Sequence, residues 1–147
     1  MLTRKLKAVL LAAAAAFALA AGAVAGEQPE PVVVVYPGVK AREIDGDTLE
    51  RIFLGKKKAW DDGSAIVLAT LHEGPVHEAF LDRWLKKTPS QFSSHWRKLV
   101  FTGKDSEPAS FASEADLLAF VAKTPGAVGY VGRGAALGTA SELKVGK

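Results

Sequence analysis

The sequence has no cysteine among its 147 residues. A chain without cysteine has no disulfide framework and no thiolate metal site, so packing alone must hold its core. Three Trp and seven Phe help to supply that core. No internal repeat is found along the chain. These absences exclude disulfide scaffolds, cysteine-based zinc folds and repeat architectures, and they leave an ordinary packed domain.

The first 25 residues have the three parts of a secretory signal peptide. Basic side chains lie within the first seven positions, residues 8–20 form an uncharged apolar run, and Ala23 and Ala25 provide the small residues that signal peptidase accepts. The alternative, a membrane anchor, is disfavoured because the run is rich in alanine and spanning helices need about 20 strongly apolar residues. The sequence therefore predicts cleavage after Ala25 and a periplasmic location.

The mature chain lacks an excess of either charge. The whole sequence has 19 Lys+Arg and 16 Asp+Glu, and residues 1–25 hold three of the basic residues and no acidic one. The sequence pI of about 9.2 is therefore a property of the export signal. No basic run is interleaved with aromatics in the manner of a nucleic-acid footprint, so no nucleic-acid partner is predicted. Residues 26–147 are long enough for one domain.

The hydrophobic patterns of residues 26–147 predict an α/β fold. Apolar, β-branched runs followed by turn residues indicate strands, and apolar residues at helical spacing indicate helices. The predicted order is β-α-β-α-α-α-β-β, with a mixed sheet flanked by helices. The predicted strands are 32–36, 66–69, 127–131 and 143–145, and the predicted helices cover 46–54, 114–123 and the segments that begin at Pro75 and Pro89.

Helix starts and stops are marked by specific residues. Asp45 can cap the first helix, and Gly55 supplies its stop. Pro75 and Pro89 occupy first helical positions, where the missing N–H costs nothing. Ser113 precedes the last helix with capping-box spacing to an acidic residue. Trp60, Trp84 and Trp96 fall within or beside apolar patterns, so core packing is the predicted role of all three.

A set of motifs resembles one protein family. Residues 51–55 read Arg-Ile-Phe-Leu-Gly, residues 60–63 read Trp-Asp-Asp-Gly, residues 101–103 read Phe-Thr-Gly, and residues 125–131 read Pro-Gly-Ala-Val-Gly-Tyr-Val. In this order they resemble the periplasmic phosphate-binding proteins of ABC transporters, and above all their short single-domain relatives. The resemblance covers roughly residues 32–131. It implies a minimal, single-domain version of the type 2 periplasmic-binding-protein fold.

The same resemblance implies a non-enzymatic function. Full-length members have two lobes that close on one oxyanion, whereas this chain is too short for two complete lobes. The implied partners are phosphate or another small oxyanion and a membrane transporter or sensor protein. No cofactor is implied.

The segment that binds the anion in the family differs here. Full-length members carry a Gly-Ser-Gly-Thr turn at a helix start, but residues 73–76 read Glu-Gly-Pro-Val. This segment has no hydroxyl group, and Pro75 lacks a backbone donor. The loop at 36–39 also lacks hydroxyl groups. No phosphate ligand is therefore carried over from the family motif.

A weaker anion site is predicted at the same helix start. The N–H groups of Val76 and His77, which follow Gly74, are unpaired there, and the helix dipole favours negative charge. Lys40 and Arg42 follow the first strand and are expected at the same edge of the sheet. Glu73 counts against an anion. The prediction is weak binding that strengthens as His77 becomes protonated near pH 6.5.

Metal and hydrolase functions find little support. His72 and His77 are one residue too far apart for a zinc-protease helix, and Gly74-Pro75 interrupts the segment. The simpler interpretation is two surface histidines at a loop–helix junction. No constellation of nucleophile and base is apparent, so no catalytic residue and no metal ligand are predicted. Two hypotheses remain: a solute-binding-like domain, and a protein-interaction or sensor-associated module that has lost its ligand.

Overall fold

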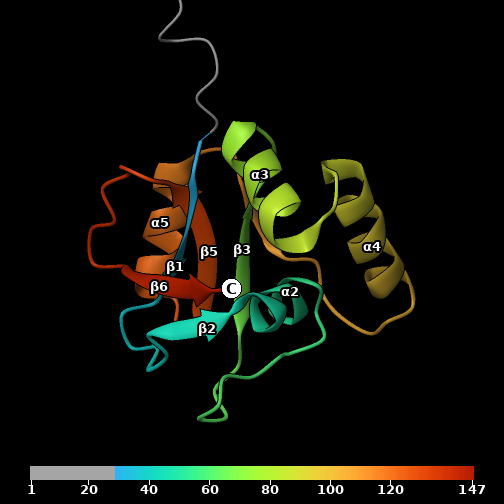
Figure 1. Ribbon diagram of the computed structural model, residues 1–147. Helices are drawn as coiled ribbons and strands as arrows, with labels where there is room; N and C mark the ends of the chain where they lie inside the picture. Colours follow the sequence, from blue (N-terminus) through green and yellow to red (C-terminus); the bar gives the residue numbers. More distant parts are fainter. Residues whose placement is uncertain (1–28) are drawn as a thin grey trace, which may run out of the picture.

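Six strands form one mixed sheet in the computed structural model, which describes residues 29–147 (Figure 1). The predicted signal peptide, residues 1–25, lies outside this part. The strand order across the sheet is β2-β6-β1-β5-β3-β4. The bounds are β1 Pro31–Val35, β2 Glu43–Asp45, β3 Val67–Leu71, β4 Ala109–Phe111, β5 Ala127–Gly132 and β6 Ser141–Gly146.

Helices cover both faces of the sheet. Gly129 and Tyr130 are neighbours on β5, so their side chains point to opposite faces. A Cβ at Gly129 would lie 2.9 Å from Leu117 of one helix, whereas the Tyr130 ring stacks on Phe80 of another at 3.9 Å. The helices are α2 Gly46–Phe53, α3 Pro75–Phe80, which continues into the π turn η1 Leu81–Leu85, α4 Pro89–Phe101 and α5 Glu114–Lys123. The predicted α/β class, with a mixed sheet flanked by helices, is confirmed.

The helix starts follow the predicted capping chemistry. The Asp45 carboxylate accepts the Thr48 N–H at 2.6 Å, and the Ser113 hydroxyl accepts the Asp116 N–H at 3.1 Å. Thr88 forms a full capping box with Gln91, which the sequence analysis did not identify. Within the described residues, no helix is long and apolar enough to cross a membrane.

Two strands were not predicted, and both lie at edges of the sheet. β2 and β4 have three residues each and each pairs with one neighbour, in parallel. Three residues are too few to show a period of two, so sequence patterning does not detect them. They extend the predicted four-strand sheet without changing its class.

The direction of β1 overturns one expectation about the sheet. β1 pairs antiparallel with β5, and β3 pairs parallel with β5, so Val35 and Leu68 are both opposite Val128. The carboxyl end of β1 therefore lies at the amino ends of β3 and β5. Lys40 and Arg42, which follow β1, are at the opposite end of β3 from Gly74, and the prediction that they share one edge is wrong. The apolar sequence of β1 predicts that the strand is buried, but it does not predict the direction of the strand in the sheet.

The three tryptophans are predicted to pack in the core; two are buried in it, and Trp84 packs against it. Trp60 and Trp96 are 7% and 4% exposed, and their indole N–H groups donate to the carbonyls of Gly126 and Phe53, each at 3.0 Å. Trp84 is only partly buried, and the Arg83 guanidinium lies 4.9 Å from its ring centroid. Its Nε1 is sealed from solvent without a partner among the described residues.

Gly126 lies where the segment that follows Trp60 approaches the start of β5 closely. Its φ is +80°, and a Cβ there would lie 2.0 Å from the Ala65 carbonyl oxygen. Gly103 has a φ of +70° and open space around its Cβ position. We expect Gly103→Ala to cost about 1–2 kcal/mol in left-handed strain alone. Gly126→Ala should cost about 3–5 kcal/mol because a backbone clash is added. Urea denaturation of the two variants measures the difference, and equal costs would contradict the close approach.

Candidate functional site

The predicted site residues fall into two groups at opposite ends of β3. Gly74, with φ +107°, is the N-cap of α3, and Val76 and His77 lie in its first turn. Arg42 donates from Nη1 to the Val39 carbonyl at 2.8 Å, and Lys40 is exposed in the same loop. The structure therefore brings together Gly74, Val76 and His77 and separates them from Lys40 and Arg42.

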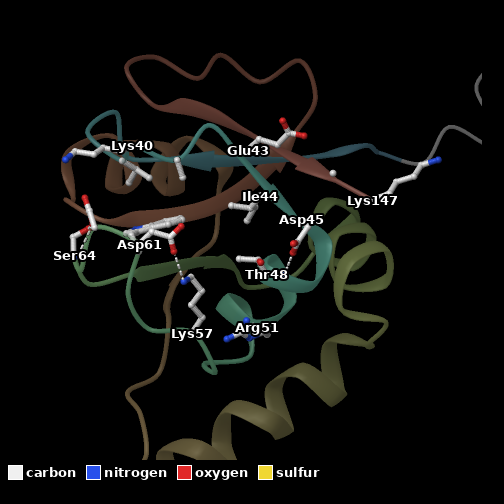
Figure 2. A pocket seen from close by; sticks show the side chains of 15 residues that line it. Lys40, Glu43, Ile44, Asp45, Thr48, Arg51, Lys57, Asp61, Ser64 and Lys147 are labelled. Carbon is white, nitrogen blue, oxygen red and sulfur yellow. Dashed lines mark hydrogen bonds and ion pairs between the residues drawn. The ribbon is translucent and has the colours of Figure 1, made fainter.

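Lys40 lines a wide cleft of about 950 Å³ (Figure 2). Lys40 and Ser64 lie toward one end of the cleft and Lys147 at the other, with Arg51 below β2. The cleft is lined by equal numbers of basic and acidic side chains. The basic ones are Lys40, Arg51, Lys57 and Lys147, and the acidic ones are Glu43, Asp45, Asp61 and Asp62.

Most of these carboxylates already have structural partners. Asp61 pairs with Lys57 at 3.1 Å. Hydrogen bonds from Thr48 lower the pKa of Asp45, and hydrogen bonds from Ser64 lower the pKa of Asp62. The carboxylates of Asp45 and Asp62 therefore stay ionised and keep the cleft near electrical balance. A cleft of balanced charge has no strong preference for anions.

His77 is buried and lines a separate cavity of about 210 Å³ beside β4 and the carboxyl end of β3. The side chain is 4% exposed. Its Nδ1 lies 2.5 Å from the Tyr130 hydroxyl oxygen, which also accepts the Leu71 N–H at 3.1 Å. The imidazole lies near the Tyr130 ring and meets the Phe92 ring edge-on, with centroid distances of 6.0 and 6.1 Å. The interpretation of His77 as a surface histidine is wrong, because the turn after β3 directs its side chain inward.

Burial keeps the His77–Tyr130 pair uncharged at neutral pH. Desolvation lowers the pKa of His77 from 6.5, and the charge of Glu78 opposes this shift only in part. Desolvation also raises the pKa of the Tyr130 phenol well above its ordinary value of 10, against a smaller opposing effect of the Leu71 hydrogen bond. A neutral imidazole does not supply the charge-assisted bond that the sequence analysis assigned to His77 near pH 6.5.

His72 lies at the exposed rim of the same cavity. Its Nδ1 is 2.5 Å from the Ser110 hydroxyl of β4. Within residues 29–147, no three His, Cys, Asp or Glu side chains are grouped so that they could hold a metal ion. The cavity lining is Thr70, Leu71, His72, His77, Pro89, Phe92, Ser93, Trp96, Glu107, Pro108 and Ser110. This lining holds three hydroxyl groups and two imidazoles but no lysine or arginine.

Sequence reasoning missed Tyr130, Ser93 and Ser110 as members of this site. Tyr130 carries the one side-chain hydroxyl in β5. A polar group among buried apolar residues needs a hydrogen-bond partner, and this was the signal in the sequence that could have pointed to the site. Its partner His77 is 53 residues away, and no spacing rule connects them. Ser110 lies on β4, the edge strand that patterning did not detect.

A second surface feature lies at the end of α4. Phe101 is 92% exposed and Val100 is 42% exposed. Arg97, Lys98 and Glu107 surround them. Trp96 and Phe92 bury the inner face of this helix, so Phe101 is not needed for the packing of α4.

The buried pair predicts a stability maximum between its two titrations. The unfolded chain binds a proton at His77 near pH 6.5 and the folded chain binds it only at a lower pH, so stability falls as the pH drops below 6.5. The unfolded chain loses the Tyr130 proton near pH 10 while the folded chain keeps it, so stability also falls as the pH rises through 10. Each group contributes up to about 1.4 kcal/mol per pH unit.

Urea denaturation from pH 4.5 to 11 measures both limbs. We expect His77→Gln to flatten the acid limb and Tyr130→Phe to flatten the alkaline limb. His72→Gln, at an exposed histidine of the same cavity, is the matched control. An acid limb that survives His77→Gln unchanged would show that another group causes it.

Comparison with known proteins places this fold. No protein-family model matches the chain. PstS from Borrelia burgdorferi aligns with 80% of the chain at a TM-score of 0.63 and 18% identity. An ABC-type phosphate transport receptor from Vibrio cholerae aligns with 80% of the chain at a TM-score of 0.53 and 15% identity. The chain covers 47% and 46% of those two structures, so it spans less than half of their length. Identity this low establishes the fold alone, and the chain has the fold of the substrate-binding proteins of phosphate ABC transporters.

Proposed function

We propose that the mature chain is an exported, non-enzymatic domain of the solute-binding type that binds a small oxyanion weakly, with phosphate as the first candidate. The ligand is proposed to bind at the carboxyl end of β3. There the backbone N–H groups at the start of α3 are close to the cavity, because His77 in the first turn of α3 lines it. The observation that supports this most directly is the buried His77 imidazole, which lines the cavity and is held through Nδ1 by the Tyr130 hydroxyl.

Export is the proposed context of this function. The signal-peptide pattern supports cleavage after Ala25, and a chain without cysteine suits the periplasm. The fold resembles receptors that serve phosphate transport, and a membrane transporter or sensor protein is the proposed protein partner. The mass of the protein in a periplasmic extract, with Gly26 as first residue, tests the export step.

Several features of the site support low affinity. Residues 73–76 have no hydroxyl group, and Lys40 and Arg42 lie at the other end of the sheet. Glu107 lines the cavity and brings a like charge to an anion. With hydrogen bonds from neutral donors only, we expect affinity nearer millimolar than micromolar, about −4 rather than −8 kcal/mol.

Calorimetric titration with phosphate, comparing two glutamate variants, tests both the activity and its location. Glu107→Gln removes the like charge from the His77 cavity and should tighten binding about 2- to 5-fold, since an exposed charge acts through a high effective dielectric. Glu43→Gln removes a carboxylate from the Lys40 cleft and is the matched control, with no expected change.

Each outcome of this titration decides one point. Tighter binding in Glu43→Gln alone would move the site to the Lys40 cleft. An absence of heat with every oxyanion up to tens of millimolar would reject the binding function.

A second candidate function, a protein-interaction module, is favoured by the exposed Phe101. Phe101 is 92% exposed beside the exposed Val100, and aromatic residues are enriched in protein interfaces. In this case, a stoichiometric partner should co-purify with the mature protein from periplasm. Phe101→Ala should remove the partner, whereas Lys144→Ala, at an exposed position on β6, should retain it. Retention by both variants would argue against this surface.

A further inference from the structure

A buried chain of hydrogen bonds fixes where the His77 proton resides. The Leu71 N–H donates to the Tyr130 hydroxyl oxygen at 3.1 Å, so this oxygen acts as an acceptor there. His77 Nδ1 lies 2.5 Å from the same oxygen. Tyr130 is fully buried, and His77 Nδ1 is the acceptor within reach of its hydroxyl hydrogen among the described residues. The phenol therefore donates to Nδ1, and a neutral ring that accepts at Nδ1 carries its hydrogen on Nε2.

The surroundings of His77 hold it neutral. Tyr130 of β5 is uncharged because burial raises its pKa. Among the described residues, the other titratable groups near the ring or lining its cavity are Glu78 of α3, Glu107 before β4 and His72 directly after β3. The α4 residues on this side, Pro89, Phe92, Ser93 and Trp96, carry no charge. Among residues 29–147, no lysine or arginine lines the cavity to compensate a negative charge there.

The cavity itself limits what can bind. Its volume of about 210 Å³ is below the range of roughly 300–1,000 Å³ that is typical of drug-sized ligands. Ser93, Ser110 and His77 are among the residues that line it. A ligand here has few heavy atoms and offers an acceptor oxygen to neutral donors. A second negative charge is unfavourable, because no cation replaces the water that it loses.

We propose that Tyr130 is a positioning residue that holds His77 as the Nε2–H tautomer, and that the cavity consequently selects small oxyanions with a single negative charge. The ligand class rests on the proposed function, whereas the role of Tyr130 does not. Nitrate carries one charge throughout the neutral range, so its binding should not change between pH 6 and 8. Phosphate gains monoanion as the pH falls, so its binding should strengthen in proportion to the monoanion fraction.

Nitrogen-15 NMR of the imidazole rings in the mature protein tests the tautomer directly. We expect His77 to show a protonated Nε2, an unprotonated Nδ1 and a titration displaced below pH 6.5. In Tyr130→Phe the donor to Nδ1 is lost, so the pKa of His77 should rise and nitrate binding should become pH-dependent. Tyr36→Phe, at the second tyrosine, which makes no side-chain hydrogen bond among the described residues, is the matched control.

The outcomes separate this proposal from the proposed function. An Nδ1–H tautomer, or a His77 ring that titrates near 6.5 in the unaltered protein, overturns the role of Tyr130 even if Tyr130→Phe does not fold. Binding of phosphate that strengthens as the pH rises overturns the selection for single charge. The Nε2–H tautomer without binding of any oxyanion supports the role of Tyr130 and rejects the proposed function.

Discussion

The pairing of β1 with a strand on each side determines the arrangement of the molecule. Its residues are almost fully buried, and it runs antiparallel to both β5 and β6. A central strand of valines has both edges hydrogen-bonded and both faces covered, so it tolerates no polar side chain. Its direction sends the basic loop at 40–42 to the amino ends of β3 and β5. The polar groups available at the carboxyl end of β3 are then those of α3, β4 and α4.

Much of the fold was predictable because it follows local rules. Capping by Asp45 and Ser113 and the stop at Gly55 depend on residues within four positions of one another, and these signals marked the helix boundaries well. Strand direction and three-residue edge strands depend on distant pairing, which one sequence does not encode locally. The candidate site combines His77, Tyr130 and Ser110, which come from distant parts of the chain, so patterning identified only the member next to a recognisable helix start.

The His77–Tyr130 pair is costly for a core to hold. A phenol and an imidazole lose water on burial, and their mutual hydrogen bond returns little net stability. An apolar pair of similar volume stacked on Phe80 would avoid the loss of stability at acid and alkaline pH. In addition, the Leu71 N–H of β3 donates its hydrogen bond to the phenol. The result is one imidazole held in a fixed orientation among the lining residues of a cavity, which is the reason to connect the pair with ligand binding.

The exposed rim of the cavity then limits the affinity that such a donor can provide. A ligand on one open domain keeps part of its contact with water, so each hydrogen bond replaces one to solvent and contributes a modest net free energy. Enclosure by a second lobe, as the resemblance to full-length binding proteins implies for them, removes that competition and strengthens neutral donors. If a protein partner covers the cavity mouth between β4 and α4, it supplies the missing enclosure, and ligand affinity then becomes a property of the complex.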